Sequence, residues 1–308
     1  MLPSITIDPD ISSAIMNAAR ADISTCYTCG SCAAACPINL ATNHLNPRKI
    51  VRMANFGLLE ELTQLPEIWY CLRCNQCNGA CPMAVKPAAL INYLREEVIR
   101  RQLVTDEVLT RYRTLCSQVQ RLRWRIALTC LRSQDILLSE DNWRQWLDSP
   151  VKYLEEAAPL DRTSKRYENF IQTIHKYMGD QINVSDCLTC GGCSNACPAC
   201  YNRGVFDPVR IIRMVNLGLI EYVIKSPEIW LCLGCQRCSE TCLYGVKGYQ
   251  IIITLRRLAR DEGLVDEYFL SRWAKANNVI YSLFVKEIDT LFNFTGQDVE
   301  TLDRNLMA

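Results

Sequence analysis

Hydrophobic positions predict a helix that begins after Asn46. Ile50, Met53 and Ala54 fall at i, i+3 and i+4, the spacing of one helix face. Asn46 is a good N-cap residue, and the proline after it suits the first helical position. Gly57 is a candidate glycine for the end of the helix. The same signals recur at residues 207–218, so this helix is expected twice.

Longer helical patterns cover Pro87–Gln102 and Gly248–Gly263. A short PEIW segment precedes each of them, and the strict alternation that marks strands is absent. The expected fold is therefore mainly α, with two tandem α-helical units, a helical linker between them and a helical C-terminal tail. The predicted divisions are 1–104, 105–186, 187–265 and 266–308.

The linker is expected to contain one or two helices within Val108–Leu131, a segment rich in arginine (Arg111, Arg113, Arg121, Arg123, Arg125 and, at its edge, Arg132). Such a segment can lie on a membrane surface, cover an acidic partner or pack against its own protein. The tail is rich in aromatic residues (Tyr268, Phe269, Trp273, Tyr281, Phe284, Phe292 and Phe294). This composition favours a packing or subunit-docking helix.

Cysteine is the unusual feature of the composition, with 19 residues in a chain of 308. Sixteen of them form four copies of the pattern C-x2-C-x2-C-x3-C. The runs are Cys26, Cys29, Cys32 and Cys36; Cys71, Cys74, Cys77 and Cys81; Cys187, Cys190, Cys193 and Cys197; and Cys232, Cys235, Cys238 and Cys242. This is the bacterial ferredoxin pattern for [4Fe–4S] clusters. A proline follows the fourth cysteine in three runs, and Leu243 replaces it in the last.

Three other uses of these cysteines compete with iron–sulfur clusters. Disulfides require an oxidising compartment, for which the sequence gives no sign. Zinc sites use paired C-x2-C motifs and would leave the third cysteine of each triple without a purpose. Buried structural cysteines would not repeat four times at fixed spacing. Iron–sulfur clusters are therefore the favoured interpretation.

The chain contains an internal duplication. Residues 26–104 align with 187–265 without insertion, and 32 of the 79 positions are identical. Residues shared between the repeats include pairs that either assist a cluster or lie on a solvated face (Arg52 and Arg213, Asn55 and Asn216, Lys86 and Lys247). Each repeat therefore holds two cysteine runs and two predicted clusters.

In two-cluster ferredoxins the fourth cysteine of one run binds the other cluster. This crossing rule predicts four ligand sets: Cys26, Cys29, Cys32 and Cys81; Cys71, Cys74, Cys77 and Cys36; Cys187, Cys190, Cys193 and Cys242; and Cys232, Cys235, Cys238 and Cys197. Three cysteines remain, and burial as small apolar side chains is favoured for them (Cys116, Cys130 and Cys200). A catalytic thiol or an alternative ligand is the competing interpretation, mostly for Cys200.

Charge and hydropathy narrow the range of binding partners and cellular locations expected for the protein. The formal net charge of +1 gives no general attraction to nucleic acid or membranes. Each oxidised cluster with its four thiolates adds about −2, so four clusters would bring the protein to about −7. No apolar run reaches the ~18 residues of a membrane span. The N-terminal sequence does not resemble a signal peptide, so a cytoplasmic location is expected.

The cysteine loop TCYTCGSCAAACPI (Thr25–Ile38) and the stretch PRKIVRMANFG (Pro47–Gly57) resemble the C subunit of heterodisulfide reductase. Related dicluster domains occur in the iron–sulfur subunits of glycolate oxidase and anaerobic glycerol-3-phosphate dehydrogenase. The C subunit of heterodisulfide reductase has one dicluster unit, whereas this chain has two. The resemblance implies electron relay between a flavin-containing A-like subunit, or another donor, and a B-like catalytic subunit that acts on disulfides or thiols.

Two features of catalytic subunits are missing from the sequence. It has no adjacent cysteine pair of the B-subunit type and no G-x-G-x-x-G phosphate loop. The leading hypothesis is an electron-transfer subunit with four [4Fe–4S] clusters. The alternatives are a catalytic subunit in which a cluster or Cys200 contacts substrate, and a structural or nucleic-acid-binding metal protein. Peripheral membrane contact stays open because of the arginine-rich linker.

Overall fold

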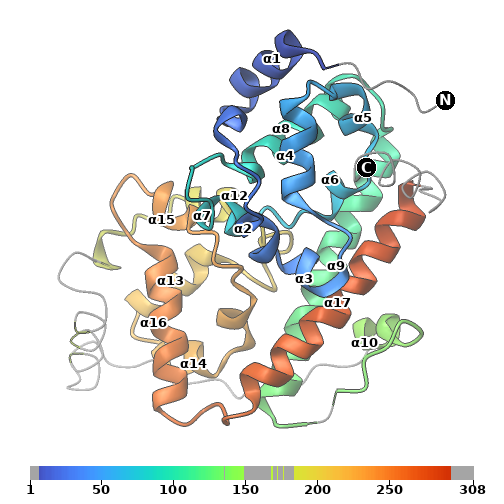
Figure 1. Ribbon diagram of the computed structural model, residues 1–308. Helices are drawn as coiled ribbons and strands as arrows, with labels where there is room; N and C mark the ends of the chain where they lie inside the picture. Colours follow the sequence, from blue (N-terminus) through green and yellow to red (C-terminus); the bar gives the residue numbers. More distant parts are fainter. Residues whose placement is uncertain are drawn as a thin grey trace. The chain divides into compact units, whose positions relative to one another are not determined.

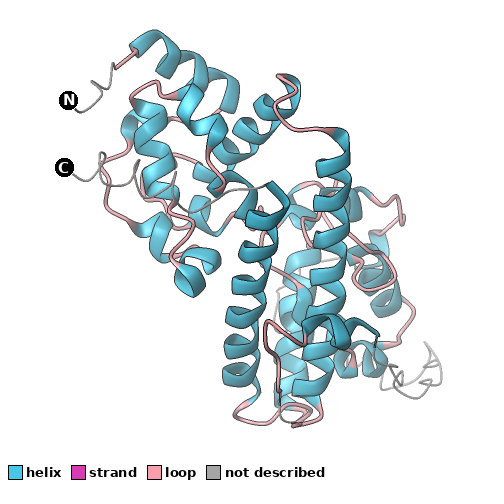
Figure 2. Ribbon diagram, turned by 90° about the vertical axis from the view of Figure 1, so that its right-hand side faces the viewer, coloured by secondary structure: helices cyan, strands magenta, loops and turns pink. Residues whose placement is uncertain are grey.

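The computed structural model describes residues 7–134, 136–148 and 184–292, together with Glu168, Gln172 and Lys176. Helices and loops make up all of this described part, and no strand occurs in it (Figure 2). The predicted mainly α fold is confirmed. Within the same residues, no helix is both long and apolar enough to cross a membrane.

The chain divides into two compact units. Unit 1 contains residues 1–115 and 278–308, and unit 2 contains residues 116–277. The long helices α9 (Asp106–Leu131) and α17 (Phe269–Phe292) each contribute residues to both units (Figure 1). Each unit contains one of the two sequence repeats. The four-part division made from the sequence stays a prediction.

Residues 7–104, which include the first repeat, fold into nine helical elements, of which α8 is the longest. They are α1 (Pro9–Ala19), η1 (Ile23–Thr25), α2 (Ser31–Ala34), α3 (Pro37–Thr42), α4 (Pro47–Asn55), α5 (Leu59–Gln64), α6 (Glu67–Tyr70), α7 (Gln76–Gly79) and α8 (Pro87–Arg100). The predicted start of α4 is confirmed, because the Asn46 side chain accepts hydrogen bonds from the backbone N–H groups of Arg48 and Lys49. Helix α8 packs against α1, α4, α5 and α6, and Ile50 and Leu90 are fully buried.

The second repeat follows the same plan in unit 2. Its elements are η2 (Val184–Asp186), α12 (Gly192–Ala196), α13 (Pro208–Asn216), α14 (Ile220–Lys225), η3 (Pro227–Leu231), α15 (Arg237–Glu240) and α16 (Gly248–Asp261), and α10 (Trp143–Asp148) precedes them. Asp207 caps α13 as Asn46 caps α4. The repeats differ after the first cysteine run, because α3 has no helical counterpart at residues 198–203.

The linker segment Val108–Leu131 lies in one continuous helix, α9. In unit 1, Tyr112 of α9 contacts the rings of Phe284 and Phe292 of α17. In unit 2, Arg123 of α9 is buried and donates a hydrogen bond to Asn277 of α17 at 3.0 Å. Part of the arginine-rich segment therefore packs against its own protein, while Arg111 is exposed.

Most of the aromatic tail lies in α17, although Phe294 lies outside the described residues. Within unit 1, the ring of Phe292 stacks on Trp69 with 4.7 Å between centroids. The Tyr70 hydroxyl also donates a hydrogen bond to Asp289. The end of α17 therefore covers the segment that leads into the second cysteine run, which is the packing role expected for the tail.

Candidate iron–sulfur sites

All four cysteine runs share an uncommon backbone conformation. In each run, the residues immediately before and after the second cysteine have positive φ (Thr28 and Gly30; Arg73 and Asn75; Thr189 and Gly191; Gly234 and Gln236). Five of these eight residues are not glycine, and the left-handed conformation costs an L-residue roughly 1–2 kcal/mol. Strained backbone of this kind concentrates at functional sites. The repetition in four loops indicates one shared conformation suited to one kind of ligand.

In unit 1, the fourth cysteine of the second run lies with the first run. Cys26, Cys29, Cys32 and Cys81 line a single cavity. Burial, followed by the charges of Cys26 and Cys81, raises the pKa of Cys32. The cavity therefore contains the four cysteines that the crossing rule assigns to one cluster.

Conversely, Cys36, the fourth cysteine of the first run, lies with the second run. Burial raises the pKa of Cys36 to about 11, and the charge of Cys71 adds to this effect. Burial and the charges of Cys71, Cys74 and Cys36 raise the pKa of Cys77. Cys36 is thus near Cys71 and Cys77 of the second run. The side chains of Cys32 and Cys77 also pack with Ala88, so both runs meet at the start of α8.

Unit 2 shows part of the same arrangement. Burial and the charges of Cys235 and Cys232 raise the pKa of Cys197, so Cys197 lies near the fourth run. Burial raises the pKa of Cys238 to about 12, and the charges of Cys232 and Cys235 contribute. The assignment of Cys242 to the third run stays a prediction.

The residues present fit [4Fe–4S] clusters. Four thiols of one predicted set line one cavity, and the loops around them are held in left-handed conformations. The backbone N–H groups of Arg73 and Gly234 donate hydrogen bonds to the sulfurs of Cys71 and Cys232, each at 3.4 Å. Because ligand thiols must lose their protons, cluster binding would be coupled to proton release.

In the described part of the chain, no three His, Cys, Asp or Glu side chains are arranged to hold a single metal ion. A mononuclear zinc site places all its sulfurs about 2.3 Å from one centre. A cubane uses a different iron for each thiolate, so its ligands need not converge on one point.

The predicted sites differ in exposure. Cys29 and Cys190, the second cysteines of the first and third runs, are exposed. By contrast, the second set of unit 1 is entirely buried (Cys36, Cys71, Cys74 and Cys77). Each unit therefore has one site that reaches the surface, and unit 1 has a second that does not.

An arginine beside the second run of each repeat was not predicted as a site residue. Arg95 is buried and donates hydrogen bonds to the backbone carbonyls of Ile68, Trp69 and Cys71. Arg256, its equivalent in the second repeat, donates to the carbonyls of Ile229 and Cys232. The signal available in the sequence was that the aligned position is arginine in both repeats.

Two of the other shared residues face outward. Arg52 and Arg213 are exposed, and the guanidinium of Arg52 lies 5.6 Å from the ring centroid of Phe56. Their positions match the solvated helix face rather than a contact with a cluster. For the remaining shared pairs, a role beside a cluster stays a prediction (Asn55 and Asn216, Lys86 and Lys247).

The three remaining cysteines occupy different environments. Cys116 and Cys130 are buried in α9, and burial raises the pKa of Cys130 to about 11. Cys200 is partly buried, and its backbone N–H donates to the carbonyl of Cys197 at 3.2 Å. Burial raises the pKa of Cys200 to about 11. Of these three thiols, Cys200 is the one placed beside a predicted ligand.

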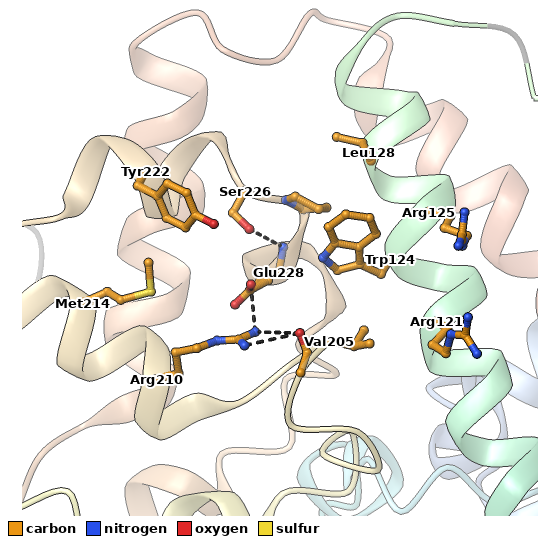
Figure 3. A pocket seen from close by; sticks show the side chains of 12 residues that line it. Arg121, Trp124, Arg125, Leu128, Val205, Arg210, Met214, Tyr222, Ser226 and Glu228 are labelled. Carbon is orange, nitrogen blue, oxygen red and sulfur yellow. Dashed lines mark hydrogen bonds and ion pairs between the residues drawn. The ribbon is translucent and has the colours of Figure 1, made fainter. Parts of the chain in front are cut away.

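Unit 2 also contains a pocket of about 260 Å³ (Figure 3). Its lining comes from α9, α13, α14, η3 and the loop before α13, and none of the described lining residues is a cysteine. Arg210 pairs there with Glu228 at 2.8 Å and donates to the Gly204 carbonyl at 3.3 Å. This pocket is therefore separate from the predicted cluster sites.

Comparison with known families matches both repeats. A family described as "4Fe-4S dicluster domain" matches residues 25–86, and a second family with the same description matches residues 183–246. The chain carries two 4Fe-4S dicluster domains. Two such domains imply four [4Fe–4S] clusters, as the cysteine runs predicted.

The chain with two dicluster domains is also similar to curated proteins. It is 33% identical over 105 residues to the iron–sulfur C subunit of CoB–CoM heterodisulfide reductase from Methanopyrus kandleri, covering 34% of this chain and 50% of the relative. It is 35% identical over 107 residues to a corresponding C subunit from Methanocaldococcus jannaschii, covering 34% and 56%. A protein from Archaeoglobus profundus named as similar to the heterodisulfide reductase C subunit is 28% identical over 120 residues, covering 36% and 63%.

The chain spans about half the length of the first two of these relatives. The predicted resemblance to the C subunit of heterodisulfide reductase is confirmed by these matches.

Proposed function

We propose that this chain is an iron–sulfur electron-transfer subunit of a heterodisulfide reductase-like complex in the cytoplasm. The observation that carries the proposal is the fold of each unit, in which two cysteine runs distant in sequence lie together. Each cluster, when bound, takes up and releases one electron at a time. The chain's own residues hold the clusters, exclude water from the buried set and offer the exposed sites to partners.

The ligand sets proposed for the four clusters follow the crossing rule. They are Cys26, Cys29, Cys32 and Cys81; Cys36, Cys71, Cys74 and Cys77; Cys187, Cys190, Cys193 and Cys242; and Cys197, Cys232, Cys235 and Cys238. The cavity of the first set and the neighbours of Cys36 and Cys197 support three of them.

The proposed partners are a B-like catalytic subunit and an A-like flavoprotein. The exposure of Cys29 and Cys190 supports electron exchange with partners near these two residues, because electron transfer requires short distances between centres. The complex would reduce a disulfide or act oxidatively on thiol or sulfane-sulfur substrates.

Iron and sulfide analysis of the anaerobically purified full chain tests the proposal. About sixteen iron atoms and as many sulfides per chain are expected for four clusters, and about eight would contradict the four-cluster form. Co-purification of untagged partners from the native host would then identify the complex. Isolation without any redox partner would contradict the subunit role.

A catalytic role for Cys200 is the second candidate. The position of Cys200 beside Cys197 favours it, because a thiol near a cluster could contact substrate. Cys200→Ala separates the two functions. Loss of turnover with unchanged cluster content and reduction kinetics would favour catalysis, whereas unchanged turnover would favour electron relay.

A further inference from the structure

A buried arginine lies beside the second cysteine run of unit 1. Arg95 belongs to α8 and is 7% exposed. Its Nε donates to the Ile68 carbonyl at 2.5 Å, and its Nη2 donates to the carbonyls of Trp69 and Cys71 at 2.9 and 2.7 Å. The guanidinium also lies 5.7 Å from the ring centroid of Tyr112. These contacts fix a positive charge next to the first cysteine of the run.

Unit 2 repeats this arrangement with Arg256. Its Nε donates to the Ile229 carbonyl and its Nη2 to the Cys232 carbonyl, both at 2.8 Å. The guanidinium lies 5.6 Å from the ring centroid of Trp230. Arg95 and Arg256 occupy equivalent positions of the two repeats. Both therefore bring a cation to the first ligand of a second run.

Hydrogen bonds to backbone carbonyls do not by themselves explain why a charged residue occupies this position. The carbonyls that Arg95 binds lie at the end of the short helix α6, where carbonyls lack partners within the helix. A neutral donor could also satisfy carbonyl groups. A cation in a poorly hydrated place costs desolvation free energy unless an anion lies close by. Four thiolates and a cluster form such an anion, with a charge of about −2.

We propose that Arg95 and Arg256 raise the reduction potentials of the clusters bound by the second run of each repeat. The inference rests on the proposed function, since it concerns the clusters that carry electrons. A fixed positive charge in a medium of low dielectric constant favours the reduced cluster, because that form carries one more negative charge. The two arginines thereby bias electrons toward the second-run clusters.

Redox titration of the full chain, followed by electron paramagnetic resonance, tests the proposal. Arg95→Met should move one redox step to lower potential, with at least a tenfold change in the ratio of reduced to oxidised cluster. That change equals about 59 mV for a one-electron couple. Arg95→Lys keeps the charge and should retain most of the wild-type potential.

Arg100→Met is the matched control on α8. The Arg100 side chain is 71% exposed, so water screens its charge and every potential should stay at the wild-type value. Unchanged potentials in Arg95→Met with all clusters present would overturn the proposal. So would an equal shift in Arg95→Met and Arg95→Lys, because hydrogen-bond geometry rather than charge would then be responsible.

If Arg95→Met fails to fold, variants of the second repeat provide the same test. Arg256 is only partly buried and donates to the carbonyls of Ile229 and Cys232, so Arg256→Met and Arg256→Lys repeat the comparison in unit 2. A wild-type chain with far fewer than about sixteen irons would instead overturn the proposed function. If the wild-type chain holds its full set of clusters and the arginine variants have unchanged reduction potentials, only this inference is overturned.

Discussion

Replacing Thr28 by glycine is expected to stabilise the cluster-loaded protein. Thr28 precedes the second cysteine of the first run, has a φ of +59° and is exposed, so the substitution removes no buried contact. The left-handed conformation costs an L-residue roughly 1–2 kcal/mol. Glycine loses roughly 0.5–1 kcal/mol more through backbone freedom on folding. The net gain therefore lies between about 0 and 1.5 kcal/mol, with a midpoint near 0.8 kcal/mol.

The assay is the thermal midpoint of the full chain, measured by circular dichroism without oxygen at one heating rate. A gain of about 1 kcal/mol raises the midpoint by about 2–4 °C for a unit of this size. Thr189→Gly repeats the test in unit 2, where φ is +54°. Iron content should match the wild type in both variants.

Thr110→Gly provides the control, because Thr110 is exposed in the interior of helix α9. Glycine is a poorer helix former than threonine by roughly a few tenths of a kcal/mol, so this midpoint should fall. If Thr28→Gly lowered the midpoint as Thr110→Gly does, the argument from backbone strain would be refuted.

Cys81→Ser and Cys36→Ser should each lower the iron content from about sixteen to about twelve atoms per chain, and each should remove the signal of a different cluster. Cys116→Ser should leave both unchanged, and loss of the same cluster in Cys81→Ser and Cys36→Ser would contradict the crossed ligand sets. Glu97→Gln should lower the thermal midpoint equally at about pH 6 and pH 8. Arginine hydrogen bonds hold the pKa of Glu97 at about 2, below its ordinary value of 4.5, so its stabilisation is complete above that ordinary value and lost only as pH falls toward 2. A midpoint difference that changes between pH 6 and pH 8 would refute this account. Iron removal by a chelator should abolish the cooperative thermal transition, because the clusters join distant segments; a sharp transition in the apoprotein would contradict this.

Local signals in the sequence predicted part of the structure. Asn46 and Pro47 marked the start of α4, and the observed helix begins at Pro47 with the expected cap. The spacing of the cysteines predicted which segments meet, since Cys81 lies with the first run in one cavity. Local hydrogen bonding determines the first feature and the number of ligands that a cluster needs determines the second.

Other features depend on contacts between distant residues. Arg95 binds carbonyls 24 to 27 residues away, and a helical position with arginine does not reveal such partners. The left-handed conformation of Thr28 was also hidden, because threonine has no local preference for it. The loss of α3 in the second repeat was likewise not apparent from the aligned sequences.

The division of α9 and α17 between the two units has a consequence for synthesis on the ribosome. Unit 1 needs residues from both ends of the described chain, including Phe292 and Asp289, whereas unit 2 is one continuous segment. At about 5–20 residues per second, the stretch from residue 116 to residue 292 takes roughly 9–35 s to translate. The unit that emerges first is therefore completed last, and every residue of unit 2 has been translated before unit 1 receives its final helix.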